Sequence, residues 1–275
     1  MHYFLLYGTL AKMGSHQNFN TNTTVKFISM KYMLLFVICT LHIELFAQTP
    51  FIYKGKVEYE KKTNQHKLIE DEAENIWYQE MMKTLPKFTT DHYELIFNSK
   101  QSAYKLIKEN PDNKYVLFGS KPSETDIILA DLQTGLMSSQ KDIFENTYLI
   151  NDSLHNTNWK ITLETREIAG FECRKAITKI CDSVYIVAFY TDQIPVAMGP
   201  ESFGGLPGLI LGLAVPRLYT TWFATKLELI DPNVNQLNSS LKGKKVNRMQ
   251  VLNEMKKGMK DWGKEGVKRV WMSQL

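Results

Sequence analysis

The residue types that most often carry catalysis are few and widely spaced in this 275-residue sequence. Ser202 lies in Pro-Glu-Ser-Phe-Gly, which lacks the first glycine of the Gly-x-Ser-x-Gly turn that exposes a hydrolase nucleophile. His66, His92 and His155 are far apart, and none lies in a His-x-His or His-Glu-x-x-His pattern. Cys173 could form a dyad with His155, but a cysteine in a buried strand gives this little support. We therefore predict no catalytic residue, no metal site, no cofactor and no enzymatic activity.

Two cysteines remain beyond the first fifty residues, and their spacing argues against a disulfide. Residues 171–177 and 184–190 read as two strands joined by a turn near Cys181. Cys173 and Cys181 are then about eight residues apart along one strand. At about 3.3 Å per residue this is more than about 20 Å, whereas a bridge needs Cα atoms within about 7 Å. We expect two free thiols, with Cys173 buried.

The first fifty residues are typical of a leader for export. Residues 30–47 begin with Met and Lys, continue with nine apolar residues and end in Leu-Phe-Ala, as a secretory signal peptide does. His42 and Glu44 interrupt the apolar run well short of the roughly 20 residues that a membrane-spanning helix needs. Lipid attachment at Cys39 is disfavoured by the bulky Ile38 before it. We interpret 1–29 as an over-extended start, 30–47 as a signal peptide and 48–275 as a single domain.

Charge is mild overall and concentrated at the C-terminal end. The formal net charge is +4, too small to indicate nucleic-acid binding. Residues 241–275 hold ten Lys and Arg against three Asp and Glu, so this tail carries +7 and the rest of the chain −3. A solvated helix face explains the tail, and contact with anionic lipid or an acidic partner is the alternative.

Alternating apolar residues predict many short strands. A first strand covers 51–60, and 93–97 with 102–106 predict a hairpin around Asn98. The alternation is clearest over 219–230, and the very apolar 209–215 predicts a buried strand with Gly212 inside it. Such a glycine marks a bulge or a close approach. Shorter strands are predicted at 114–118, 127–130, 148–150 and 159–163.

Two segments change to helical spacing. Over 65–85, Leu68, Ile76 and Trp77 belong to an apolar stripe opposite acidic residues, so we predict an amphipathic helix after the first strand. Near the C-terminus, Asn247 and Gln250 have the spacing of a capping box, followed by a second apolar stripe. We predict a mainly β (α+β) fold: a curved antiparallel sheet or half-open barrel with an N-proximal helix and a C-terminal helix.

One glycine-rich stretch stands out as a candidate motif, structural or ligand-binding. Leu-Pro-Gly-Leu at 206–209 predicts a type II turn in which Gly208 takes a positive φ. A structural corner is the favoured interpretation, and a site of close ligand approach is the alternative. The motif residues are Gly204, Gly205, Leu206, Pro207, Gly208, Leu209 and Ile210.

The sequence resembles the GLPGLI family in this stretch and around it. Gly-Leu-Pro-Gly-Leu-Ile at 205–210 is similar to the motif that names the family. The family's order is also matched before this motif, by Trp159, Cys173, the Phe-Tyr-Thr-Asp run at 189–192 and Gly199. The resemblance covers roughly 50–270. It implies an exported envelope protein of Gram-negative bacteria with no established activity, and it brings no catalytic residue with it.

Two functions remain after these exclusions. The first is an interaction or structural module of the periplasm or outer membrane, docking on an envelope partner. The alternative is a carrier that holds a hydrophobic ligand such as a lipid or acyl chain inside a curved sheet. Large aromatic residues are assigned to the core rather than to a ligand site. They are Trp159, Phe189, Tyr190, Phe203 and Trp222.

Overall fold

The structure is a computed structural model that describes Tyr32 and residues 51–70, 76–113, 121–143, 146–181, 183–232 and 241–275. The chain divides into the units Met1–Thr49 and Pro50–Leu275. Except for Tyr32, the predicted leader at 30–47 and the upstream residues lie outside the described residues. The strand predicted at 114–118 does so too.

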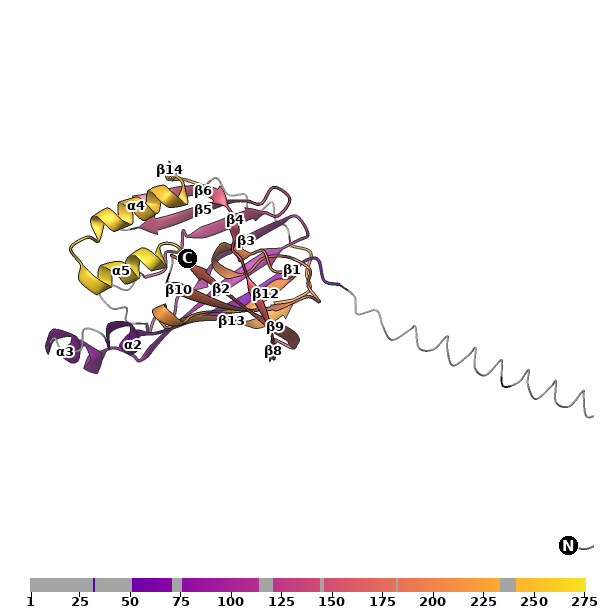
Figure 1. The fold of residues 1–275 in the computed structure, drawn as a ribbon, viewed down its shortest axis with the longest axis horizontal. Helices are drawn as coiled ribbons and strands as arrows, with labels where there is room; N and C mark the ends of the chain where they lie inside the picture. The colour runs from indigo at the N-terminus through magenta and orange to yellow at the C-terminus, as the bar shows by residue number, and fades with distance from the viewer. Residues whose placement is uncertain are drawn as a thin grey trace, which may run out of the picture. The chain divides into compact units, whose positions relative to one another are not determined.

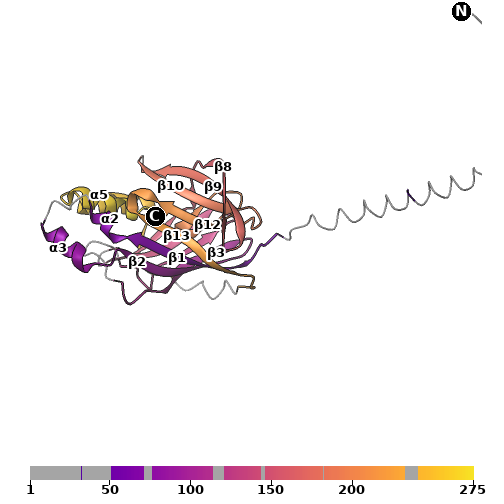
Figure 2. The same ribbon diagram turned by 90° about the horizontal axis from the view of Figure 1, so that it is seen from below.

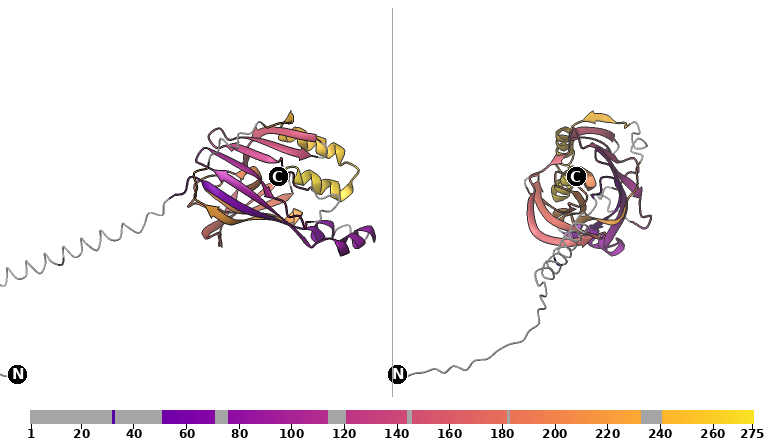
Figure 3. Two further views of the ribbon diagram at one scale, coloured as in Figure 1. Left: turned by 180° about the vertical axis from the view of Figure 1, so that it is seen from behind. Right: turned by 90° about the vertical axis from the view of Figure 1, so that its right-hand side faces the viewer.

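Twelve strands of the second unit form one curved sheet (Figures 1 and 3). In chain order they are β1 (Gly55–Asn64), β2 (Phe88–Phe97), β3 (Gln101–Lys108), β4 (Ile127–Asp131), β5 (Leu136–Ile143), β6 (Asn146–Ser153), β8 (Lys160–Ile168), β9 (Phe171–Ile180), β10 (Val184–Thr191), β12 (Leu209–Val215), β13 (Thr220–Glu228) and β14 (Lys244–Val246). Their spatial order is β14-β6-β5-β4-β3-β2-β1-β13-β12-β10-β9-β8. Neighbours are antiparallel except for β14 and β6. The predicted fold class is confirmed.

The core is formed by the side chains that alternate strand positions direct to the covered face of the sheet. In β2, residues 89, 91, 93, 95 and 97 are buried while their neighbours are partly exposed, as expected where one face of a sheet is covered. The predicted hairpin is present, with Leu95 opposite Tyr104. Strand β12 is buried along almost its whole length. A Cβ at Gly212 would lie 2.9 Å from Ile168 Cδ1 and from a ring carbon of Phe223, so the predicted close approach is made by the chain itself.

The described parts of the N-proximal segment are helical, and the second of them does not pack as predicted. Helix α2 covers Gln65–Ile69 and buries Leu68 and Ile69. Helix α3, Ile76–Thr84, has no buried residue, and Ile76 is 75% and Trp77 48% exposed. The expected apolar stripe is therefore not buried in α3. Periodicity fixes the faces of a helix, but only tertiary contacts decide whether a face is covered.

The C-terminal segment forms two helices instead of one. Asn247 caps α4 (Arg248–Gly258), and the predicted capping box with Gln250 is complete. Gly263, with φ +54°, then opens α5 (Gly263–Met272). Figures 1 and 2 show these helices at the same end of the unit as α2 and α3. The tail is only partly a solvated face, because the Lys268 side chain is buried and its ammonium donates to the Leu68 carbonyl.

Both cysteines of this unit are free thiols, as predicted. Cys173 on β9 is fully buried and Cys181 lies exposed at the following turn. The β9–β10 ladder runs from Arg174 opposite Tyr190 to Ile180 opposite Val184, so Cys173 and Cys181 lie just beyond its two ends. Burial raises the pKa of the Cys173 thiol to about 12, so it stays protonated and unreactive near neutral pH.

Candidate functional site

The 204–210 motif forms a tight corner between β10 and β12. A Cβ on Gly208 would lie 2.0 Å from the Thr191 carbonyl oxygen, and one on Gly204 would lie 2.4 Å from the Ala197 carbonyl oxygen. The predicted type II turn is wrong in its central feature, because Gly205 and not Gly208 has a positive φ, of 82°. Gly208 has no side chain because two backbone segments meet there, and not because of its own dihedral angles.

Two backbone carbonyls of this corner accept hydrogen bonds from side chains elsewhere in the chain. The Tyr59 hydroxyl donates to the Ile210 carbonyl at 2.7 Å, and the Trp159 indole N–H donates to the Gly204 carbonyl at 2.8 Å. The side chains of Leu206, Leu209 and Ile210 are buried, whereas Gly205 and Pro207 are exposed.

Immediately before this corner, the chain turns a glutamate into the interior. Glu201 (φ 52°, ψ 36°) and Ser202 (φ 62°) both have left-handed backbone conformations in the short turn Pro200–Ser202. Non-glycine residues adopt this region only where the surroundings impose it. The Glu201 carboxylate is almost fully buried, 3.3 Å from Lys61 Nζ and 3.7 Å from Lys141 Nζ. Burial acts to raise its pKa, but the two ammonium groups outweigh this effect and lower it.

Glu201 lies at one wall of a cavity of about 410 Å³. The cavity is partly open to solvent, and its lining comes from β1–β5 and β13 of the sheet and from helices α2, α4 and α5. Its volume falls within the range of small-molecule sites. Its lining combines charged, polar and apolar side chains, among them Lys61, Gln65, Leu68, Asp91, Tyr93, Tyr104, Asp126, Ile128, Lys141, Glu201, Leu218, Trp222, Met255, Arg269 and Met272.

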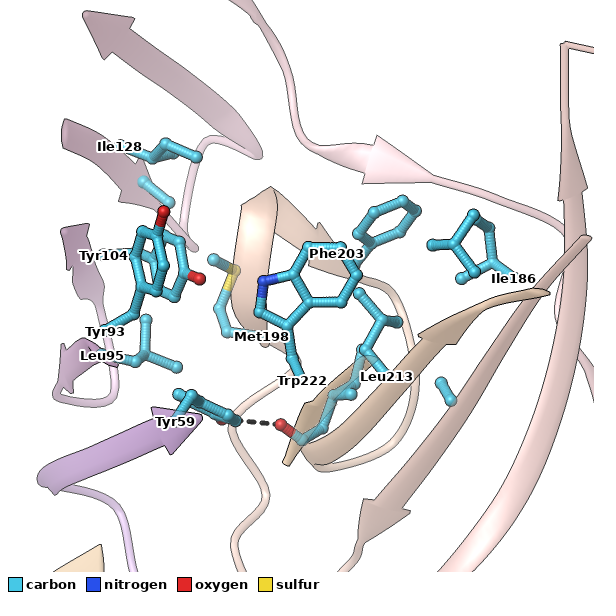
Figure 4. Close-up of a cluster of buried hydrophobic side chains, with 14 of the residues drawn as sticks. Tyr59, Tyr93, Leu95, Tyr104, Ile128, Ile186, Met198, Phe203, Leu213 and Trp222 are labelled. Atoms are coloured by element: carbon cyan, nitrogen blue, oxygen red, sulfur yellow. Dashed lines mark hydrogen bonds between the residues drawn. The ribbon is translucent and has the colours of Figure 1, made fainter. Parts of the chain in front are cut away.

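Three buried polar atoms of uncharged side chains in this lining make no hydrogen bond of normal geometry with the described residues, although the Trp222 indole is near enough to Tyr104 and Glu201 to affect the pKa of both. The three atoms are Tyr104 Oη, Trp222 Nε1 and Gln65 Oε1. Figure 4 shows the Trp222 indole nitrogen directed toward the hydroxyl ends of Tyr93 and Tyr104. The rings of these two tyrosines are stacked with centroids 5.1 Å apart. Buried polar groups in native proteins are nearly always paired with protein, water or ligand, so these three point to an occupant of the cavity.

Another polar group of the cavity, the Asp126 carboxyl, has a raised pKa. Burial is the main cause of the shift to about 6, reinforced by Asp142 and Glu201 and opposed by Lys141 and by the Asp142 backbone N–H. That N–H donates to Asp126 Oδ1 at 2.8 Å. The ionised carboxylate is therefore less stable in the folded protein than in water.

We predict that Asp126→Asn raises the free energy of unfolding at pH 7.5 by on the order of 1–3 kcal/mol. The folded-state pKa of about 6 exceeds the ordinary value of 3.8, so ionisation destabilises the fold above pH 6 and ceases to do so as the pH falls toward 4. Asparagine keeps the oxygen acceptor without the charge. Urea unfolding of both proteins at pH 7.5 and pH 4 measures the effect. An advantage of equal size at both pH values would contradict it.

The predicted chemistry-bearing residues do not assemble into one site. Ser202 is buried, and its nearest polar partner is the Arg248 guanidinium at 3.4 Å. His66 hydrogen-bonds to the Leu85 carbonyl. The His155 side chain lies outside the described part, so the dyad with Cys173 stays untested. Among the described residues no group of three or more His, Cys, Asp or Glu is arranged to hold a metal ion.

Sequence reasoning missed most of the cavity. Lys61, Tyr104, Asp126 and Lys141 come from three strands and the loop before β4, and no local spacing connects them. Trp222, which the sequence predicts as a core residue, is fully buried and also lines the cavity. The one available signal was Glu201, a charged residue within an apolar, glycine-rich stretch.

The comparisons with known proteins assign no activity. No curated protein matches the chain. Similar solved structures include PNGF-II in two crystal forms, with 18% and 17% identity, TM-scores of 0.48 and 0.47, and coverage of 72% and 70% of this chain. The chain spans only 32% of PNGF-II. An uncharacterized conserved protein from Thermus thermophilus aligns over 71% of this chain and 90% of its own, at 4% identity and a TM-score of 0.37.

No function follows from likeness at this level. Within the described residues, no helix combines the length and apolar character needed to cross a membrane.

The GLPGLI name stays a prediction. Over residues 178–212, which hold the 204–210 motif, the chain matches the family model described as "Protein of unknown function (Porph_ging)".

Proposed function

We propose that this domain is a non-enzymatic binding module that holds a small polar molecule in the cavity beside Glu201. The observation that carries the proposal is the set of three buried, unpartnered polar atoms in the cavity lining, Tyr104 Oη, Trp222 Nε1 and Gln65 Oε1. A ligand that pairs with them removes the free-energy penalty of leaving them unsatisfied, which is about 1–3 kcal/mol for each group.

The cavity wall favours a polar ligand over the acyl chain considered from the sequence. A carrier of acyl chains needs a continuous apolar wall, whereas Lys61, Lys141, Asp126 and Glu201 all line this cavity. An activated nucleophile is not expected from Cys173, whose raised pKa keeps it protonated. In this proposal the 204–210 motif acts as a structural corner that fixes the position of Glu201.

Export and docking are retained as proposals of lower rank. The leader pattern at 30–47 supports a module that meets its ligand outside the cytoplasm. Docking on an envelope partner is supported by the exposed Ile76 and Trp77 of α3. It is supported less by the basic tail, because Lys268 is buried and Arg269 lines the cavity.

The test is a titration of ¹⁵N-labelled protein with phosphate, acetate, glycine, glucose, glycerol and laurate. The readout is the Trp222 indole N–H signal, identified among the five tryptophans by its loss in Trp222→Phe. We expect a saturable shift with at least one polar compound. Ser273→Trp, in the cavity lining just beyond α5, is expected to fill the cavity and abolish the shift, and Asn253→Trp, on the exposed face of α4, to retain it.

Each outcome of this titration has a meaning for the proposal. A response to laurate alone would support the hydrophobic carrier and overturn the polar module. The absence of any response in folded protein would also overturn the polar module. A shift that persists unchanged in Ser273→Trp would place binding outside the cavity, which also contradicts the proposal.

A further inference from the structure

We propose that the ligand of this cavity is a neutral polyhydroxy compound, such as a cyclic polyol or simple sugar. This inference rests on the polar binding module proposed above and names its ligand class. It derives from the way in which hydrogen-bond donors, hydrogen-bond acceptors and charges are distributed over the cavity wall.

The wall places groups that only donate beside groups that only accept. Lys61 Nζ, Lys141 Nζ and Trp222 Nε1 can only donate, whereas the ionised Glu201 carboxylate can only accept. The distances of 3.3 and 3.7 Å from Glu201 to the two lysines exceed the usual length of a charge-assisted hydrogen bond, about 2.7–2.9 Å. The Trp222 indole N–H is near enough to Glu201 to help lower its pKa, yet makes no hydrogen bond of normal geometry. Glu201 therefore leaves donor capacity around it unused.

A charged ligand would be opposed at this wall. An anion that approaches Lys61 and Lys141 also approaches the Glu201 carboxylate, and a cation that approaches Glu201 meets both ammonium groups. The cavity as a whole is close to neutral. Among its described lining residues five side chains are cationic and four are anionic, and two of the cations, Lys105 and Lys121, are paired with Glu94 and Glu109.

A hydroxyl group satisfies both kinds of wall atom at once. It donates its proton to Glu201 or to Gln65 Oε1, and its oxygen accepts from the Trp222 N–H or a lysine. Tyr104 Oη can act in either direction. Several hydroxyls on one carbon frame are needed because the unpartnered atoms come from α2, β3 and β13. The C–H edges of that frame would face the apolar part of the wall, formed by Leu68, Ile128, Leu218, Met255 and Met272.

The experiment compares ligands of the same carbon skeleton by calorimetry and by the Trp222 indole signal. The probes are myo-inositol and glucose, with cyclohexanol as the matched ring that carries one hydroxyl, and phosphate, acetate and glycine as charged probes. We expect saturable binding of at least one polyhydroxy probe, and binding of cyclohexanol at least tenfold weaker.

Matched variants then test the wall atoms. Tyr104→Phe removes a buried, unpartnered hydroxyl without changing the ring, so we expect it to fold normally and to weaken polyol binding about tenfold. Tyr148→Phe removes a hydroxyl that binds Glu254 outside the cavity and is expected to leave polyol binding unchanged. Equal binding by Tyr104→Phe and the unmodified protein would overturn the inference.

The outcomes separate this inference from the proposed function. If phosphate, acetate or glycine binds and the polyhydroxy probes do not, the polar module stands and the ligand class is wrong. If no probe of any class moves the Trp222 signal in folded protein, both fail together.

Discussion

Replacing Gly208 with alanine is expected to lower the free energy of unfolding by about 3 kcal/mol or more. A Cβ at this position would lie 2.0 Å from the Thr191 carbonyl oxygen and 2.7 Å from its carbonyl carbon. Thr191 ends β10 and is paired with Leu209 in the ladder to β12, so its backbone cannot move without breaking that pairing. Urea unfolding of the two proteins measures the loss, and the shift of the corner should also weaken any binding beside Glu201.

Gly258 provides the matched control for this substitution. It is the last residue of α4, and a Cβ there meets nothing within 4 Å. Gly258→Ala is therefore expected to be neutral or to stabilise by a few tenths of a kcal/mol. Equal effects of the two substitutions would show that Gly208 does not hold a close approach, and the structural account of the 204–210 motif would fail.

The second large effect is expected for Lys61→Met, with a loss of roughly 2–3 kcal/mol at neutral pH. Removing one partner of a fully buried ion pair costs about 3–5 kcal/mol, and the value is reduced here because the Lys61 side chain is 27% exposed. The ammonium also lies 4.9 Å from the Trp222 ring centroid. Glu201 would be left with Lys141 at 3.7 Å as its cationic partner in the described cluster.

The pH dependence identifies the cause of this loss. The pKa of Glu201 is lowered in the folded protein, so its ionised form stabilises the fold above its ordinary pKa of 4.5 and this contribution disappears as the pH falls through the lowered value. The loss in Lys61→Met should therefore shrink below pH 4.5. In Lys61→Met/Glu201→Gln the loss should be less than the sum of the two single losses. Lys62→Met, at an exposed neighbouring position, serves as control, and a loss as large there would contradict the argument.

Local patterns predicted the features that depend on neighbours in the chain. The 93–106 hairpin, the Asn247 capping box and the lack of a disulfide between Cys173 and Cys181 each follow from spacing within about a dozen residues. The exposure of the apolar face of α3 could not be predicted, because it depends on whether other elements pack against Ile76 and Trp77. The break before Gly263 divides a stripe that looks continuous in the sequence.

The cavity could not be predicted from the sequence for a related reason. Lys61 and Glu201 are 140 residues apart and meet only through the order of the strands. The role of Gly208 was mistaken because a turn signature and a close approach between strands both require glycine, and the sequence alone does not distinguish them.

The pairing of β1 with β13 has a consequence for how the chain reaches its native state. Val57 lies opposite Leu227, so a central ladder of the sheet joins segments that are 170 residues apart in the chain. Such a high contact order predicts slow refolding, in milliseconds to seconds. Until residue 228 is available, β1 and β12 each present an open edge, so nascent or truncated chains should be prone to aggregation and should depend on chaperones.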